Sequence, residues 1–233
     1  MNILECRNIT KSYKKNFPVL FNFNLEIPKG RIVGLLGPNG CGKSTLIKLI
    51  SGLLQPENGE ILVDGKPVGE ESKAIISYLP ERTYFNSSMR VCELVGFFSE
   101  FYSDFDTARA FKLLEDLKIN PSSKLKSLSK GTKEKVQLIL VMSRRAKLYL
   151  LDEPIAGVDP AAREYILSTI VSNYDPEASI IITTHLITDV EQVLDDFVFL
   201  SFGGKILKSG NAEDARRMSG KSLDELFREV FRC

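Results

Sequence analysis

The chain has 233 residues, which is enough for one large domain or two small ones. Lysine and arginine number 31 against 30 aspartates and glutamates, and hydrophobic residues make up 43%. This composition is typical of a globular protein. It provides no overall positive charge that would attract nucleic acid, so no nucleic-acid partner is expected.

The sequence lacks the features of an exported or membrane-spanning chain. Its first ten residues alternate apolar and polar side chains, as a strand does, and differ from the apolar core of a signal peptide. No stretch approaches the roughly 20 apolar residues of a membrane helix. The four cysteines, at positions 6, 41, 92 and 233, are too far apart for a metal knuckle and suit free thiols. A cytoplasmic protein is therefore expected.

The first third of the chain is predicted to be rich in strands. A polar turn that carries Tyr13 joins the first two. The third is a short apolar run, typical of a buried strand, and a glycine-rich turn leads from it into an amphipathic helix at about 43–52. The predicted strands are residues 2–9, 19–27, 31–36, 60–64 and 74–79.

Between about residues 84 and 146 the pattern becomes helical. Apolar side chains recur there at helical spacing, at Phe97, Phe98, Phe101, Leu113, Leu114 and Leu117. We therefore predict a helical insertion subdomain that separates two parts of a core, at about 1–83 and 147–210.

After the insertion, strands and helices alternate again. Strands are expected at 147–152, 179–184 and 196–202, helices at 160–173 and 186–194, and two short helices in a tail at 211–233. This alternation predicts an α/β fold, with a mainly parallel sheet, helices on its faces and an amino-terminal antiparallel β subdomain. The chain is expected to form one domain.

Residues 37–45 match the phosphate loop of nucleotide-binding proteins, in which two glycines four residues apart precede lysine and serine. The glycines let successive backbone N–H groups turn toward an anion, and the lysine and serine serve the outer phosphates and Mg²⁺. Because the loop joins a predicted buried strand to a helix, we expect a P-loop NTPase core. The loop is Gly37, Pro38, Asn39, Gly40, Cys41, Gly42, Lys43, Ser44 and Thr45. Cys41 is either a neutral spacer or a redox brake.

Asp152 and Glu153 stand at the carboxyl end of an apolar strand. Ligands bind at that edge of open α/β sheets. We expect Asp152 to hold Mg²⁺ through water and Glu153 to orient or deprotonate the attacking water. The alternative is that two acids merely begin a loop.

With these motifs, Leu128-Ser129-Lys130-Gly131-Thr132 resembles the signature of ATP-binding-cassette (ABC) transporter ATPases, usually written LSGGQ. The resemblance covers about residues 2–210. It implies that Ser129 and Gly131 contact the ATP held by a second ATPase subunit, identical or different, and that Asp159 lies where the two subunits meet. Ser129 and Asp159 are also ordinary helix N-caps. Lys130 and Thr132 depart from the motif.

The resemblance also assigns roles to three single residues. His185, the only histidine, falls where the family has a switch histidine that hydrogen-bonds the γ-phosphate; packing or solvation is the alternative. Tyr13 resembles the aromatic residue that stacks on adenine, or else it packs against the first strands. Glu81 stands where the family has a glutamine that touches Mg²⁺. It either ligates the metal or faces solvent.

The leading hypothesis is an ATPase subunit, bound at the cytoplasmic face of the membrane, of a transporter whose permease is a separate chain. The resemblance places the permease contact at residues 82–98, where Tyr84, Phe85 and Met89 either meet the permease or belong to the helical core. The short insertion and the Ser-Lys-Gly-Thr signature favour an export-type subunit. A soluble ABC ATPase, such as one for iron–sulfur cluster assembly, and a nucleotide-binding regulator without turnover are the alternatives.

Overall fold

The computed structural model describes residues 1–14, 17–156 and 160–231. Its strands form two sheets. The first is antiparallel, in the order β2-β1-β4-β5, and the second has the order β10-β9-β3-β8-β7-β6. The first sheet contains β1 (Asn2–Lys14), β2 (Phe17–Pro28), β4 (Asn58–Val63) and β5 (Lys66–Pro67). The second contains β3 (Ile32–Leu36), β6 (Ile76–Leu79), β7 (Leu148–Asp152), β8 (Ser179–Thr184), β9 (Asp196–Ser201) and β10 (Lys205–Asn211).

All neighbours in the second sheet are parallel except β9 and β10, which confirms the predicted α/β fold. Helix α1 (Lys43–Ile50) packs between the two sheets, where its apolar side chains share one core with Ile3 and Leu150. The other face of the parallel sheet is covered by α6 (Pro160–Ser172), α7 (Ile187–Val190), α8 (Ala212–Ser219) and α9 (Leu223–Val230). With both faces covered, β3, β7 and β8 are buried along their whole length.

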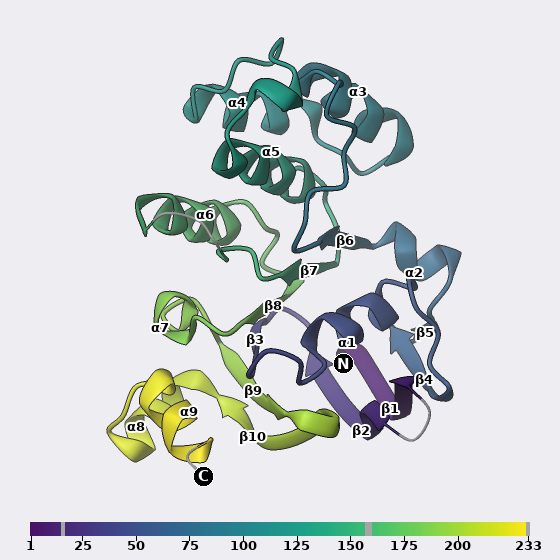
Figure 1. Ribbon diagram of the computed structural model, residues 1–233, viewed down its shortest axis with the longest axis vertical. Helices are drawn as coiled ribbons and strands as arrows, with labels where there is room; N and C mark the ends of the chain where they lie inside the picture. The colour runs from purple at the N-terminus through teal and green to yellow at the C-terminus, as the bar shows by residue number, and fades with distance from the viewer. Residues whose placement is uncertain (15–16, 157–159, 232–233) are drawn as a thin grey trace.

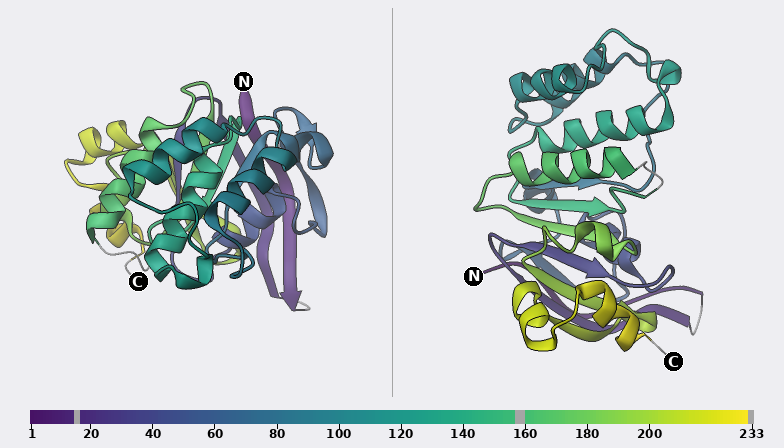
Figure 2. Two further views of the ribbon diagram at one scale, coloured as in Figure 1. Left: turned by 90° about the horizontal axis from the view of Figure 1, so that it is seen from above. Right: turned by 90° about the vertical axis from the view of Figure 1, so that its left-hand side faces the viewer.

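A separate helical layer stands above the parallel sheet (Figures 1 and 2). It consists of α3 (Val91–Phe101), α4 (Thr107–Asp116), the 3-10 turn Leu125–Ser127 and α5 (Lys130–Met142). Helix α5 belongs to two cores: Val136 and Ile139 pack into the helical layer, whereas Leu138 and Val141 pack toward the sheet. This double burial fixes α5 between the two parts of the molecule. The division of the chain at residues 84 and 146 stays a prediction.

The structure differs from the predicted elements in several places. β1 runs on to Lys14, so Tyr13 lies in the strand and not in the polar turn expected after residue 9, and the two-residue strand β5 was not predicted. A short helix, α2 (Glu70–Ala74), precedes β6, so that strand begins at Ile76. The helix expected at 186–194 is a single turn, α7, and Asp195 beyond it accepts a hydrogen bond from the backbone N–H of Ile32, which ties the chain to the start of β3. An edge strand, β10, was not predicted, because most of its side chains are exposed and it lacks an apolar face.

The two predicted helices of the tail are present as α8 and α9. Leu223 and Leu226 are buried, and Phe227 meets Phe199 of β9 edge to face at 5.3 Å between ring centroids. The tail therefore packs on the core. In the part of the chain that the structure describes, no helix is long and apolar enough to cross a membrane.

Candidate functional site

The phosphate loop lies between β3 and α1, as predicted. Gly40 and Gly42 have φ angles of 82° and 110°, a backbone region that residues with a Cβ rarely adopt. A Cβ at Gly37 would stand 2.2 Å from the carbonyl oxygen of Leu200, so the loop runs tightly against β9. The glycines are thus required by the loop's shape, which turns its backbone around the start of α1.

Lys43 is only 5% exposed and its side chain curls back into the loop. Its ammonium donates to the carbonyl oxygens of Gly37 at 2.8 Å and Pro38 at 3.3 Å, and lies 3.6 Å from Oε1 of Glu153. A positive charge is therefore held at the centre of the loop, beside the N-terminus of α1. This arrangement suits a phosphate group.

Asp152 is 2% exposed at the end of β7. One of its oxygens, Oδ1, accepts hydrogen bonds from Ser44 Oγ at 3.0 Å and Thr183 Oγ1 at 2.6 Å. Burial raises the pKa of the Asp152 carboxyl, and the bonds from Thr183 and Ser44 partly oppose this rise. Among the described residues, no three His, Cys, Asp or Glu side chains gather as a metal cluster. A carboxylate beside a hydroxyl fits Mg²⁺, which is usually held by one or two carboxylates together with substrate phosphates.

Glu153 and His185 meet at the mouth of the same site. Both carboxylate oxygens of Glu153 lie 3.1 Å from Nδ1 of His185. Glu153 has a φ of 51°, unusual for a residue with a side chain, and its N–H donates to Thr183, to both the carbonyl and the hydroxyl oxygen at 3.1 Å. Because tertiary bonds hold this strained backbone, the carboxylate is kept in a fixed direction, a feature frequent at functional sites.

These groups surround one cavity of about 440 Å³, a size common for small-molecule sites. Tyr13 stands at its edge with 59% of its surface exposed and its hydroxyl 3.2 Å from Thr45 Oγ1, so its ring is not packed into the first sheet. Ser129 and Gly131 do not line this cavity. Its lining residues are Tyr13, Val19, Asn39, Gly40, Gly42, Lys43, Ser44, Thr45, Glu81, Glu153, Ala156 and His185.

The pattern of the ABC transporter family matches residues 20–156 of the chain. The chain belongs to this family. It is 32% identical to the ABC transporter ATP-binding protein YtrB of Bacillus subtilis, over 99% of the chain and 75% of that protein. It is 30% identical to the ABC-type transporter ATP-binding protein EcsA of the same organism, over 99% of the chain and 97% of that protein.

Solved structures agree with this assignment. The ATP-binding subunit of an ABC transporter superimposes with a TM-score of 0.88 at 30% identity, over 99% of the chain and all of that subunit. The ADP conformation of another ABC cassette gives a TM-score of 0.78 at 27% identity, over 99% and 98%. The predicted family and the P-loop NTPase fold are confirmed.

The ABC signature segment lies at the start of α5. Ser129 is the N-cap of that helix: its Oγ accepts a hydrogen bond from the N–H of Thr132 at 3.2 Å and lies 2.8 Å from the Thr132 hydroxyl. Gly131 has open space where a Cβ would stand. Ser129 is thus an ordinary cap, and a phosphate role would be additional to it.

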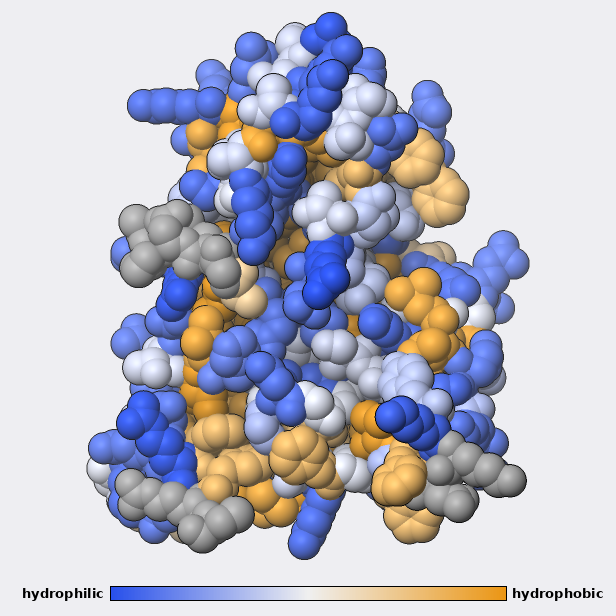
Figure 3. All heavy atoms as spheres, in the orientation of Figure 1, coloured by the Kyte–Doolittle hydropathy of each residue, from blue (hydrophilic) through white to orange (hydrophobic). Residues whose placement is uncertain are grey.

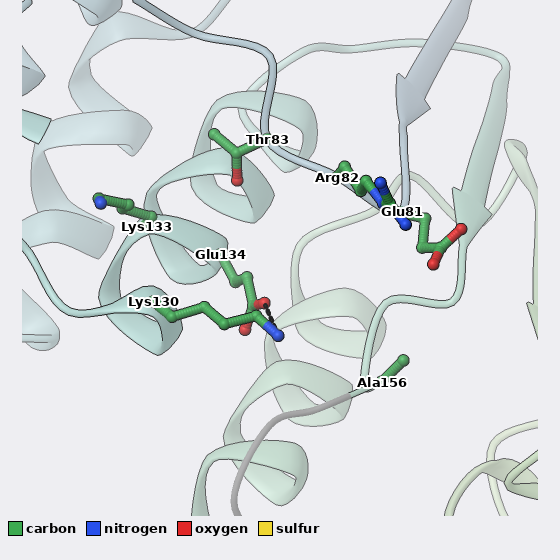
Figure 4. Close-up of a pocket in the computed structure, with 7 residues that line it drawn as sticks. All are labelled: Glu81, Arg82, Thr83, Lys130, Lys133, Glu134 and Ala156. Atoms are coloured by element: carbon green, nitrogen blue, oxygen red, sulfur yellow. Dashed lines mark ion pairs between the residues drawn. The ribbon is translucent and has the colours of Figure 1, made fainter. Parts of the chain in front are cut away.

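A second cavity, of about 450 Å³, opens between the segment after β6 and the first turn of α5 (Figure 4). Its walls carry charges of both signs. The ammonium nitrogen of Lys130 lies 3.9 Å from Oε1 of Glu134, which is a long ion pair. Glu81 and Ala156 line both cavities, so the second cavity adjoins the nucleotide cavity. The lining residues of the second cavity are Glu81, Arg82, Thr83, Lys130, Lys133, Glu134 and Ala156.

The buried carboxyl of Glu134 should make the stability of the fold depend on pH. Its Oε2 is buried without a hydrogen-bond partner, and burial raises the pKa of its carboxyl although Lys130 opposes this. Because the folded state binds the proton more tightly, stability is lost as pH rises from the ordinary carboxyl value of 4.5 through the raised pKa, and no loss exists well below 4.5. Glu134→Gln should therefore raise the melting temperature by about 2 °C at pH 7.5 and leave it unchanged near pH 4. Calorimetry of both chains checks this, and a gain of equal size at both pH values would contradict it.

Two of the predicted residues are Asp159 and Cys41. Asp159 lies outside the residues that the structure describes. Cys41 is a fully buried residue of the phosphate loop, and burial raises the pKa of its thiol, which disfavours the reactive thiolate. The structure therefore supports the spacer role of Cys41 over the redox brake.

Thr183 is a site residue that the sequence reasoning missed. It pairs with Asp152 in the register of β7 and β8, and it bonds both the carboxylate of Asp152 and the N–H of Glu153. The available signal was its place at the end of the apolar run 180–182, the same edge of the sheet at which Asp152 was expected.

Proposed function

We propose that this ABC cassette binds ATP with Mg²⁺ in the 440 Å³ cavity and hydrolyses it. The observation that carries the proposal is the contact of Glu153 with His185, beside the buried ammonium of Lys43. A carboxylate held between a histidine and a phosphate-binding lysine is placed to act on water at the γ-phosphate.

Each part of the cavity has a proposed binding role. The N–H groups of the loop and Lys43 hold the phosphates, and the exposed ring of Tyr13 stacks on adenine. Ser44, Asp152 and Glu81 hold Mg²⁺. The ion, when bound with ATP, neutralises phosphate charge.

In hydrolysis, Glu153 orients a water molecule and accepts its proton as the oxygen attacks the γ-phosphorus. The bond from that phosphorus to the bridging oxygen of ADP breaks. His185 keeps the carboxylate in place through Nδ1, and its opposite ring edge is left to face the γ-phosphate. Lys43 stabilises the negative charge on the transferred group.

The cavity is proposed to be half of a composite site. Ser129 is exposed at the start of α5, outside the cavity, and Gly131 accompanies it. We propose that both residues contact ATP held by a second ATPase subunit, the same chain or a related one, and that Asp159 lies at the junction. ATP would then join the two subunits.

An exposed aromatic surface supports a permease contact. Tyr84, Phe97 and Phe101 are 64%, 53% and 68% exposed, and apolar surface is visible beside α3 in Figure 3. Phe85 and Met89 instead pack against the core of the helical layer. We propose that a separate permease docks on the three exposed rings and so holds the cassette at the cytoplasmic face of the membrane.

We propose that the cassette is an export-type subunit, on its likeness to a relative. The chain is 27% identical to SkfE of Bacillus subtilis, named a SkfA peptide export ATP-binding protein, over 87% of each chain. The exposed rings favour a permease partner over a soluble ATPase of iron–sulfur assembly.

The test of turnover is Mg²⁺-dependent phosphate release by the purified chain. Lys43→Ala should lower it to background, because the buried ammonium would be lost from the phosphate site. A chain that binds ATP but releases phosphate no faster than Lys43→Ala would be a regulator without turnover, and the proposed function would be wrong.

The metal role of Glu81 has its own test. Glu81→Gln removes a negative charge from the cavity edge, so the Mg²⁺ concentration for half-maximal ATP hydrolysis should rise about threefold. Glu71→Gln, which alters an exposed carboxylate on α2, is the control. Superimposable Mg²⁺ titration curves for Glu81→Gln and the native chain would contradict the metal role.

A further inference from the structure

Gln137 is a buried polar side chain in the apolar part of α5. It is 2% exposed, and residues 136 to 142 of the helix are otherwise apolar. A buried amide is costly unless it is hydrogen-bonded. The bond that Gln137 makes runs from Nε2 to the carbonyl oxygen of Pro80 at 3.1 Å. The hydrogen bond to Pro80 therefore offsets the cost of burying the Gln137 amide at this position.

Pro80 lies between the end of β6 and the segment that lines the two cavities. It follows β6, an edge strand whose pairing with β7 ends at Leu79, so its carbonyl oxygen lies past the last paired residue. Glu81 comes next and lines both cavities. The bond from Gln137 thus fastens the start of the segment 81–83 to α5.

The same two segments face each other across the second cavity. Arg82 and Thr83 form one wall, and Lys130, Lys133 and Glu134 in the first turns of α5 form the other (Figure 4). Ser129 caps that end of the helix. One hydrogen bond therefore joins the base of the segment that carries Glu81 to the helix that carries Ser129.

We propose that Gln137 is a positioning residue that keeps Glu81 at a fixed place relative to the signature end of α5. Through this bond, a displacement of α5 moves Glu81, and the reverse also holds. The inference rests on the proposed metal role of Glu81, and it adds a residue that contacts neither ATP nor Mg²⁺.

Ser77 provides a matched control within the same pair of elements. Its buried hydroxyl donates to the carbonyl oxygen of Val141 at 2.9 Å, which also joins β6 to α5, but three residues before Pro80 and about one turn beyond Gln137 in α5. Gln137→Met and Ser77→Ala each remove one buried side-chain hydrogen bond without adding bulk. If Gln137 only strengthens the packing of α5 on β6, the two variants should behave alike.

The first measurement is trypsin cleavage after Arg82 in the folded chain without nucleotide. Arg82 is exposed, so the rate depends on how freely its segment opens. Gln137→Met should speed this cleavage about fivefold, since one buried hydrogen bond anchors the segment, and Ser77→Ala should leave it unchanged. Equal rates in all three chains, or equal acceleration by both variants, would overturn the proposal.

The second measurement is ATP binding as a function of Mg²⁺, in a Glu153→Gln background that prevents turnover. Gln137→Met and Glu81→Gln should each raise the half-saturating Mg²⁺ about threefold, and the double variant should rise no further, because both act through Glu81. A shift with Glu81→Gln but not with Gln137→Met would overturn the positioning role and leave the metal role intact. No shift with either would refute both, and additive shifts would show that Gln137 acts independently of Glu81.

Discussion

Glu153→Gln is expected to lower the rate of ATP hydrolysis at least about a hundredfold while ATP still binds, since a positioned general base contributes about 10²–10⁴-fold. Glutamine has nearly the same shape but does not accept a proton from water. The buried ammonium of Lys43 and the phosphate loop are unchanged, so the affinity for ATP should be kept or increased. Steady-state phosphate release measures the rate, and equilibrium binding measures the affinity.

Glu164→Gln is the matched control for this substitution. Glu164 has the same side chain on the exposed surface of α6, outside the residues that line the cavity. Its replacement should change the hydrolysis rate less than twofold. A Glu153→Gln chain that kept a tenth or more of the native rate would show that another group activates the water.

Arg144→Met is expected to destabilise the fold by about 3–5 kcal/mol, the usual result of removing one partner of a buried ion pair. The Arg144 side chain is 3% exposed and bonds both carboxylate oxygens of Asp104, at 2.9 and 3.0 Å. It also donates to the carbonyl oxygens of Ala74 and Ile76, and lies 3.8 Å over the ring of Tyr102. Its loss would leave these acceptors without a donor in a largely buried place.

Arg145 is the natural control, because it is the next residue and pairs with Asp106 at the surface. Its side chain is 71% exposed, so Arg145→Met should cost about 0–1 kcal/mol. Urea unfolding of the two variants gives both free energies. Losses of equal size would contradict the view that Arg144 ties the helical layer to the parallel sheet.

Local sequence patterns predicted the parts of the site that lie close together in the chain. The phosphate loop needs glycines at fixed spacing, because the positive φ of Gly40 and Gly42 is a local requirement. The acids at 152 and 153 follow an apolar strand, which is also a local signal. Such motifs can be found without knowledge of the fold.

Contacts between distant segments were harder to predict. Thr183 joins Asp152 only because β7 and β8 pair in one register, and Gln137 meets Pro80 only because α5 lies on β6. β10 was missed because an exposed edge strand lacks an apolar pattern. Whether Tyr84 or Phe85 faces outward depends on how α3 packs, so both alternatives stayed open until the structure placed them.

We propose that this cassette holds half of a site which a second subunit completes. Sedimentation velocity of the Glu153→Gln chain with saturating ATP and Mg²⁺ tests it most directly, because hydrolysis cannot then release the bound nucleotide. If two copies of this chain complete the site, the 26.1 kDa chain should sediment as a dimer with ATP and as a monomer without it, and Ser129→Glu should abolish the dimer. A chain that stays monomeric at saturating ATP, alone and together with a related ATPase subunit, would contradict the composite site.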